Sequence, residues 1–246
     1  RCNNKRKMKK KIAVFTGAGI SAESGVATFR DTGDGLWYNY KIDEVATVEA
    51  WRKDRGKVLE FHNMLRSKLK GIEPNDAHKA LVKLEDIFDV TIITQNVDSL
   101  HEKAGSTNVL HLHGELTKAR SCLYNHKPSP LDELIDIGYN DLNLGDKDPK
   151  TGSQLRPHTV LFGEFPYNTQ EAYDAIGDAD YLLIIGTSLQ ITYTLQLLNT
   201  SGSKTKVYYI DPNPSKALDV YGMNIKYIEK SAVEGVTEVV NELLKK

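Results

Sequence analysis

The chain has 246 residues, 40% of them hydrophobic and 26% charged, with a formal net charge of −1. This balance is typical of a globular protein and gives no electrostatic reason to expect a nucleic-acid or membrane-surface partner. No apolar run approaches the roughly 20 residues that cross a bilayer, so we expect no membrane partner. The only two cysteines, Cys2 and Cys122, exclude a disulfide framework, and the basic N-terminus lacks a secretory apolar segment, which predicts a cytoplasmic protein.

Seven short runs rich in Val, Ile and Tyr predict β-strands. Most are continuously apolar rather than alternating, as in parallel strands that are covered on both faces. Helical periodicity at 76–87 and 233–245 predicts helices between or after them, joined by right-handed crossovers. We therefore predict an α/β fold, a parallel sheet with helices on both faces. The seven runs are 11–17, 89–96, 108–114, 158–164, 179–188, 206–213 and 224–230.

Two long segments interrupt this alternation of strands and helices. Residues 33–72 contain a loop followed by an amphipathic stretch that indicates a helical insertion. Residues 117–156 are rich in Pro, Asp, Asn and Gly, which is typical of irregular structure. We predict that the two segments together form a second, smaller module that faces the sheet.

The first predicted strand runs directly into GAGISAESG, which fits the G-x-G-x-x-[G/A] pattern through Gly17, Gly19 and Ala22. Glycines there let backbone amides approach a pyrophosphate at a helix N-terminus, so the motif predicts dinucleotide binding on a Rossmann-like sheet. The alternative interpretation is a strand-to-helix turn made of small residues. The acidic residue that hydride-transfer enzymes carry about 20 residues later is missing, because that interval is a loop.

Polar residues collect at two further places. The loop after the glycines holds Phe29 and Arg30, which could cover the reactive half of a dinucleotide or form an ordinary surface turn. Gln95, Asn96 and Asp98 follow a predicted buried strand, where open parallel sheets collect their ligand groups. Asn96 and Asp98 could hydrogen-bond a ribose or a nicotinamide amide.

His111 and His113 lie two residues apart in the run 108–114, so in an extended strand both side chains point to the same face. They could be a metal pair, a core pair, or a catalytic base beside a packed neighbour. A metal pair needs a third ligand, and the sequence offers none at suitable spacing. We therefore predict that His113, nearer the ligand edge, is a general base and that His111 is packed.

These residues carry a resemblance to a known family. GAGISAESG, FRD, TQNVD, HLHGEL, RPHTVLFGE and GTSL occur in the order found in the sirtuins, NAD-dependent protein lysine deacylases, and the chain resembles the compact bacterial type over 10–242. The resemblance implies NAD as cofactor and an acylated-lysine protein or peptide as partner. It implies a Rossmann-like NAD-binding domain of residues 10–32, 73–116 and 157–246, and a small module of residues 33–72 and 117–156.

The resemblance also implies the roles of individual residues. His113, Asn96 and Asp98 would be catalytic. The acyl oxygen would attack the ribose C1′ as nicotinamide leaves, and His113 would then help a ribose hydroxyl attack the adduct, giving O-acyl-ADP-ribose. Val160, Phe162 and Gly163 would pair with the peptide. NAD would contact Gly17, Ala18, Gly19, Ser21, Ala22, Phe29, Arg30, Gln95, Asn96, Asp98, Gly186, Thr187, Ser188, Asp211 and Ala232.

Two other functions would use the same scaffold. One is an NAD-consuming mono-ADP-ribosyltransferase or NAD hydrolase, and the other is a catalytically silent NAD-binding module. Some sirtuin-like proteins of the first kind lack the ordinary catalytic set. The presence of Asn96, Asp98 and His113 therefore favours deacylation.

The chain departs from the family where most sirtuins bind a structural zinc with two Cys-x-x-Cys pairs. Cys122 is followed three residues later by Asn125, and no other cysteine comes after it. His126, Asp146 and Asp148 fit no recognised zinc spacing. We therefore predict that the small module holds no metal and depends on apolar contacts. The candidates for these contacts are Leu123, Leu131, Leu134, Ile135, Ile137 and Tyr139.

A second departure concerns the acyl group. Sirtuins that remove succinyl or malonyl groups use a Tyr-x-x-Arg pair on the helical insertion, and here His62 and Leu65 take those positions. Arg66 is one residue further, about 100° around a helix, so it should not reach the same pocket. We predict a preference for neutral acyl chains, with acetyl the default and longer apolar chains accepted beside Met64 and Leu65.

Overall fold

Six parallel strands form the main sheet of the protein. The computed structural model describes residues 9–27, 40–122 and 133–245. Within them the strand order is β3-β2-β1-β7-β8-β9, the doubly wound order in which the chain builds outward from β1 in one direction and then from β7 in the other. The strands are β1 (Lys11–Thr16), β2 (Asp89–Thr94), β3 (Val109–His111), β7 (Tyr181–Ile185), β8 (Lys206–Ile210) and β9 (Ile225–Ile228).

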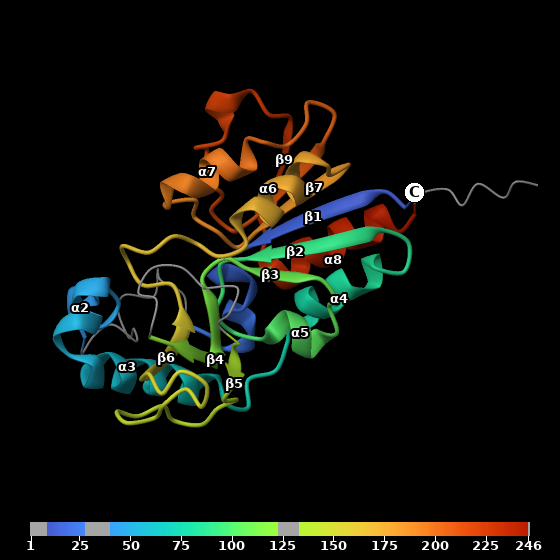
Figure 1. Ribbon diagram of the computed structural model, residues 1–246. Coiled ribbons are helices and arrows are strands. Elements are labelled where there is room, and N and C mark those ends of the chain that lie inside the picture. Colours follow the sequence, from blue (N-terminus) through green and yellow to red (C-terminus); the bar gives the residue numbers. More distant parts are fainter. Residues whose placement is uncertain (1–8, 28–39, 123–132, 246) are drawn as a thin grey trace, which may run out of the picture.

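Helices cover both faces of this sheet, with α4, α5 and α8 on one side and α6 and α7 on the other (Figure 1). Consecutive residues of β1 face opposite cores: Val14 packs with α4 and α8, whereas Phe15 packs with α6 and α7. This explains why the strand runs are continuously apolar. None of the helices that the structure describes is long and apolar enough to span a membrane. The helices are α4 (Asp76–Leu84), α5 (Leu100–Ala104), α6 (Thr169–Gly177), α7 (Thr192–Leu198) and α8 (Ala232–Leu243).

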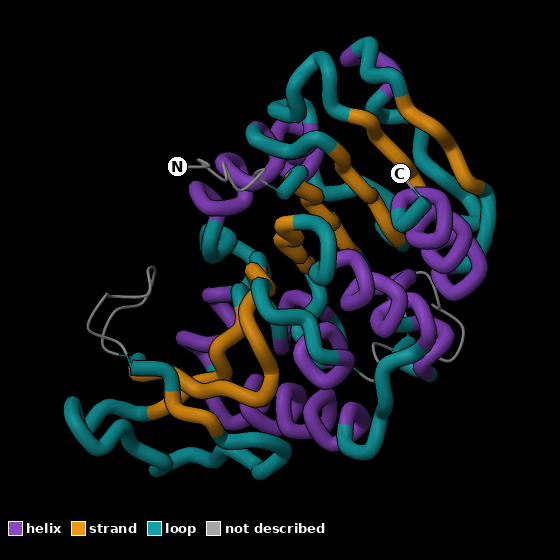
Figure 2. Tube along the Cα trace, turned by 90° about the vertical axis from the view of Figure 1, so that its right-hand side faces the viewer, coloured by secondary structure: helices purple, strands orange, loops and turns teal. Residues whose placement is uncertain are grey.

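A separate antiparallel sheet forms the centre of a smaller module, which lies at the lower end of the molecule in Figure 2. Its strand order is β5-β4-β6, and the elements around it come largely from the helical insertion. The strands are β4 (Gly114–Ser121), β5 (Ile135–Asp136) and β6 (Leu155–Thr159), and the helices are α1 (Ile42–Val45), α2 (Val48–Lys53) and α3 (Arg55–Leu69).

The run predicted as a strand over 158–164 therefore does not join the parallel sheet. Its first residues end β6, which pairs antiparallel with β4, and the chain then leaves the strand. Gly114 makes this junction possible because its φ is +81° and an added Cβ would lie 2.0 Å from the carbonyl oxygen of His158. The backbone can thus turn from β3 directly into the second sheet.

The module has an apolar core of its own, built around Trp51, Leu59 and Ala119. Ile135 and Ile137 pack against it, as predicted. The prediction was wrong for Leu134, which is 39% exposed because it precedes β5, a two-residue strand at the edge of the sheet. Tyr139 instead lies under the ammonium group of Lys103, and Leu123 and Leu131 lie outside the described residues.

Candidate active site

The turn after β2 is held by the last residue of the neighbouring strand β3 and by the segment that follows it. The carbonyl oxygen of Gln95 lies 2.8 Å from Nδ1 of His113. The carbonyl oxygen of Asn96 lies 3.0 Å from Nδ1 of His111. The next carbonyl accepts the backbone N–H of Leu116 at 3.0 Å. The carbonyls of residues 95, 96 and 97 are thus all hydrogen-bonded. Because a carbonyl can only accept, both histidines carry a proton on Nδ1.

His113 has the arrangement of a neutral base. Because Nδ1 donates to Gln95, Nε2 of the neutral ring is an acceptor, and it lies 2.8 Å from the hydroxyl of Tyr193 on α7. Burial lowers the pKa of His113, so the ring is neutral at physiological pH. Burial raises the pKa of Tyr193 to about 12, so its hydroxyl keeps the proton that it donates to Nε2.

Tyr193 did not emerge from the sequence. It lies on α7, a short helix whose residues are mostly apolar, and nothing in that pattern separates it from a packed tyrosine. Only the fold shows that its hydroxyl meets a histidine 80 positions away in the chain.

Ser21 connects the first loop to the same turn. Its hydroxyl donates to Oδ2 of Asp98 at 3.0 Å and accepts from the side-chain amide of Asn96 at 3.1 Å. The other oxygen of Asp98 accepts the backbone N–H of Leu100 at 3.0 Å. All three side chains are buried, and burial raises the pKa of Asp98. We call these three residues the Ser21–Asn96–Asp98 cluster.

The glycine motif meets the loop after β7 at the point where the strand order reverses. The backbone N–H of Gly19 donates to the carbonyl oxygen of Gly186 at 2.8 Å. A Cβ on Gly19 would lie 2.6 Å from the Cα of Gly186, so only glycine allows this approach. The motif does not begin an α-helix as predicted: residues 18–20 and 22–24 form two short 3-10 turns. The close approach to Gly186 is what bends the chain here.

Further predicted cofactor contacts lie at the carboxyl ends of β7 and β8, at the start of α8 and in the first loop. The Thr187 hydroxyl donates to the side-chain oxygen of Gln95 at 3.0 Å, which joins the β7 loop to the β2 turn. Asp211 follows β8 and accepts the backbone N–H of Asn213 at 2.8 Å. Ser188 follows Thr187, Gly17, Ala18 and Ala22 belong to the first loop, and Ala232 begins α8. Phe29 and Arg30 lie outside the described residues.

The predicted peptide segment follows β6. The backbone N–H of Val160 donates to the carbonyl oxygen of His113 at 2.9 Å, which places this segment directly beside the candidate base. Phe162 pairs with the helical insertion, because its N–H donates to Ala46 and its carbonyl accepts from Val48. Its side chain is 55% exposed, and Gly163, which is also exposed, follows it.

A buried ion cluster, which the sequence analysis missed, fixes this segment. Arg156 makes two hydrogen bonds to the carboxylate of Glu164, at 2.6 and 3.0 Å, and also donates to the carbonyl of Thr159 at 3.0 Å. The same carboxylate accepts the backbone N–H of Leu161 at 2.8 Å and lies 3.4 Å from Arg120. The Arg156 and Glu164 side chains are 4% and 3% exposed. The only signal in the sequence is a pair of opposite charges that flank VLFG.

The two helix positions predicted to face the acyl chain differ in environment. His62 is buried, with Nδ1 2.8 Å from the carbonyl of Val58 and Nε2 3.1 Å from the hydroxyl of Thr159. Burial lowers its pKa to about 4, so the ring is neutral. Leu65 is half-buried. The guanidinium of Arg66 is directed to β4, where Nε donates to the carbonyl of Leu116 at 2.6 Å.

Among the residues that the structure describes, no group of three or more His, Cys, Asp or Glu side chains could hold a metal ion. Asp146 and Asp148 accept backbone N–H groups within their own turns. Asn125 and His126 lie outside the described residues, so the absence of a zinc site stays a prediction.

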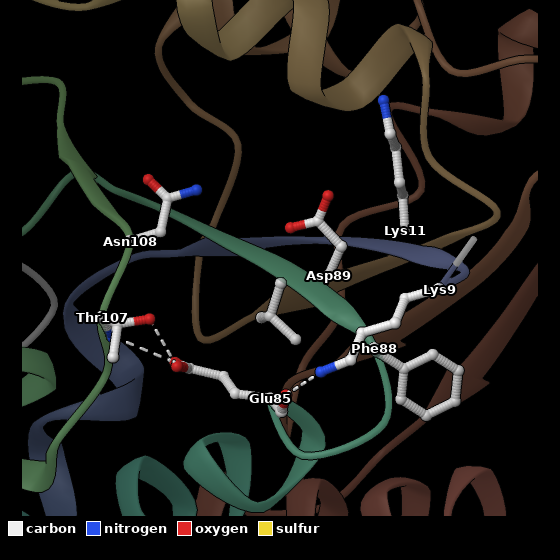
Figure 3. A pocket seen from close by; sticks show the side chains of 8 residues that line it. Lys9, Lys11, Glu85, Phe88, Asp89, Thr107 and Asn108 are labelled. Atoms are coloured by element: carbon white, nitrogen blue, oxygen red, sulfur yellow. Dashed lines mark hydrogen bonds between the residues drawn. The ribbon is translucent and has the colours of Figure 1, made fainter. Parts of the chain in front are cut away.

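A hollow on the opposite edge of the sheet contains none of these groups. It lies at the amino-terminal ends of β1 and β2, where Glu85 accepts from Lys9 and Thr107 (Figure 3). Open parallel sheets bind ligands outside the carboxyl ends of their strands, so the candidate site is the other edge. The hollow is lined by Lys9, Lys11, Glu85, Phe88, Asp89, Val90, Thr107 and Asn108.

Comparison with known proteins agrees with this architecture. A family model described as the Sir2 family matches residues 17–193. An NAD-dependent protein deacylase of Aggregatibacter actinomycetemcomitans is 49% identical over 208 residues, 85% of this chain and 96% of the relative. One of the same name from Helicobacter pylori is 45% identical over 235 residues, 96% of this chain and 98% of the relative. A solved Sir2 homologue in complex with NAD superposes with a TM-score of 0.79 at 31% identity, covering 96% of this chain and 90% of that one. The chain therefore belongs to the Sir2 family, the sirtuins.

Proposed function

We propose that the protein is an NAD-dependent protein lysine deacylase that removes neutral acyl groups and produces nicotinamide and O-acyl-ADP-ribose. The observation that carries the proposal is the environment of His113. Its Nδ1 is held by the carbonyl of Gln95, the residue before Asn96 of the Ser21–Asn96–Asp98 cluster, so Nε2 of the neutral ring is an acceptor. Its backbone carbonyl binds the segment predicted to receive the peptide. Relatives that bear the name NAD-dependent protein deacylase at 43–49% identity support the same activity.

The side chains at this edge suit a dinucleotide with two riboses and an amide. When bound, NAD supplies the ribose carbon to which the acyl oxygen is transferred. The Ser21–Asn96–Asp98 cluster combines a hydroxyl, an amide and a buried carboxylate, which can bind ribose hydroxyls or a nicotinamide amide. The tight contact of Gly19 with Gly186 brings the first loop against the β7 loop, where a pyrophosphate would lie.

His113 would accept the proton of a ribose hydroxyl at Nε2. Its other nitrogen is fixed by the Gln95 carbonyl, so the ring cannot change tautomer without losing that hydrogen bond. A positioned base of this kind contributes roughly 10² to 10⁴ in rate. The hydroxyl of Tyr193 occupies Nε2 in this structure and would have to leave when the ribose arrives.

The preference for neutral acyl groups rests on helix α3. A succinyl or malonyl carboxylate needs a cation or a strong donor. His62 is neutral, with a pKa of about 4, and both of its ring nitrogens have partners. Arg66 donates through Nε to the carbonyl of Leu116 and through a second guanidinium nitrogen to the side chain of Asn63. Burying a carboxylate beside Leu65 without a partner would be costly.

Mass spectrometry of a single reaction tests the proposal. Acetyl-lysine and succinyl-lysine forms of one peptide are incubated with the enzyme and NAD. We expect O-acetyl-ADP-ribose and free lysine, with the acetyl peptide consumed faster. ADP-ribosylated protein or free ADP-ribose alone would indicate the transferase or hydrolase, and no product would indicate a binding module. Faster cleavage of the succinyl peptide would contradict the acyl preference but not the deacylase activity.

A further inference from the structure

We propose that His111 is a buried imidazolium that positions the turn after β2 for NAD binding, and that Glu102 is the group that keeps it protonated. The inference rests on the proposed function, because it assigns the turn to the NAD site. It concerns a histidine that the catalytic step itself does not use.

The geometry around His111 requires two ring protons. Nδ1 faces the carbonyl oxygen of Asn96 at 3.0 Å, and Nε2 faces a carboxylate oxygen of Glu102 at 2.8 Å. Both partners only accept, whereas a neutral imidazole has one N–H. In the neutral ring, one nitrogen lone pair would face an oxygen lone pair. The pKa of Glu102 is lowered by its hydrogen bond to His111 against the effect of burial, which keeps the carboxylate ionised, so only the imidazolium satisfies both contacts.

His113, two residues along the chain, has the opposite arrangement. Its Nδ1 also donates to a carbonyl of the turn, but its Nε2 meets the hydroxyl of Tyr193, which can donate. The partners therefore leave His113 neutral and His111 charged. The same turn is thus bound by one imidazole that serves as a base and one imidazolium that does not.

The charged groups around His111 favour its protonated form. The side chain is 6% exposed, and burial opposes the charge, but the hydrogen bond and charge of Glu102 outweigh it and raise the pKa of His111. Burial lowers the pKa values of His101 and His158 and keeps both rings neutral. These two histidines therefore add no positive charge that would oppose protonation of His111. The titratable groups that face the His111–Glu102 pair are Glu102 and His101 on α5, Asp98 after β2, Glu115 and Lys118 on β4, and His158 on β6.

When His111 loses a proton, its hydrogen bond to the turn should break, whereas its hydrogen bond to Glu102 should remain. A hydrogen bond to a carboxylate is roughly twice as strong as one to a neutral carbonyl, so the neutral ring keeps its proton on Nε2. The Nδ1 contact with Asn96 is then lost, and the side-chain amide of Asn96 is the group that binds Ser21 and, through it, Asp98. Because the pKa of His111 is raised in the folded protein, the contact is present below that pKa and lost as pH rises through it.

NAD affinity against pH, measured by calorimetry, tests the inference. For wild type we expect affinity to fall roughly two- to tenfold on the alkaline side, the loss of about one hydrogen bond. Glu102→Gln removes the charge, and its amide can donate to Nε2, so Nδ1 keeps the proton for Asn96 and the alkaline fall should disappear. Glu60→Gln, an exposed residue on α3, is the matched control and should keep the fall.

Substitutions of His111 separate its two contacts. His111→Asn places an amide near the position of Nδ1 and should keep NAD binding independent of pH, whereas His111→Gln reaches only toward Glu102 and should bind NAD weakly at every pH. Equal affinities for these two variants would overturn the inference. So would a Glu102→Gln profile parallel to wild type, which decides the matter even if the His111 variants fail to fold.

The readout does not depend on deacylation. If the wild type binds NAD but converts no acetyl peptide, the proposed function is wrong, and the binding measurements alone decide the inference about His111. If the wild type does not bind NAD, both the proposed function and the inference about His111 are wrong.

Discussion

Removing the hydroxyl of Tyr193 should make the enzyme bind NAD more productively. The hydroxyl lies 2.8 Å from Nε2 of His113, and that nitrogen has a single lone pair in the ring plane. The ribose hydroxyl that His113 would deprotonate needs the same lone pair. The free enzyme must therefore give up one hydrogen bond before the base can act.

The size of the effect follows from that one bond. A neutral hydrogen bond contributes about 0.5 to 1.5 kcal/mol net, because water would otherwise take its place. In Tyr193→Phe the ring keeps its edge-on contact, with centroids 6.2 Å apart, while the hydroxyl loses its bond to Nε2 of His113 and its hydrogen bond with the Gln95 side chain. We expect KM for NAD to fall by about two- to twelvefold, with little change in kcat.

The assay is initial-rate deacylation of an acetyl peptide at saturating peptide and varied NAD. Tyr173→Phe is the matched control, because it removes a hydroxyl from the neighbouring helix α6 and leaves the His113 contact in place. An unchanged or higher KM for Tyr193→Phe would refute the reasoning. A fall in kcat by an order of magnitude would do so as well, because it would make the hydroxyl part of the proton transfer.

Three further predictions concern the small module and stability. Glu164→Gln should cost about 3 kcal/mol in the free energy of unfolding, measured with urea, because it leaves Arg156 buried without its ion pair, and it should raise KM for the peptide more than KM for NAD. Equal changes in the two KM values would mean that the cluster does not position residues 160–163. The melting temperature should fall as pH drops from about 6.5, because His62 and His158, with pKa values of about 4 and about 3, stay neutral in the folded protein while the unfolded chain takes up protons. A flat profile down to the acid limb of the carboxylates would contradict those pKa directions. A strong chelator should leave activity and melting temperature unchanged, and loss of both would show a structural metal.

Local patterns in the sequence predicted the parallel sheet and the edge at which the candidate site forms. The continuous apolar runs indicate strands covered on both faces, and Gln95, Asn96 and Asp98 follow one of them directly, so their place at the carboxyl end needs no tertiary information. His113 could be singled out for the same reason. The resemblance to the sirtuins added the roles of these residues.

Contacts between distant segments could not be predicted in this way. Whether His111 is packed or charged depends on Glu102, which comes from a helix that the periodicity did not identify. Tyr193 matters only because α7 lies over the end of β3. The strand β6 looks like another member of the parallel sheet until Gly114 turns the chain into a second one.

The direct test of the account is the rate of acetyl-peptide deacylation by His113→Ala, measured beside NAD binding on the same preparation. If His113 is the base, the rate should fall by roughly 10² to 10⁴ while NAD still binds, since the Ser21–Asn96–Asp98 cluster is intact. A variant that keeps most of the wild-type rate would contradict the central claim.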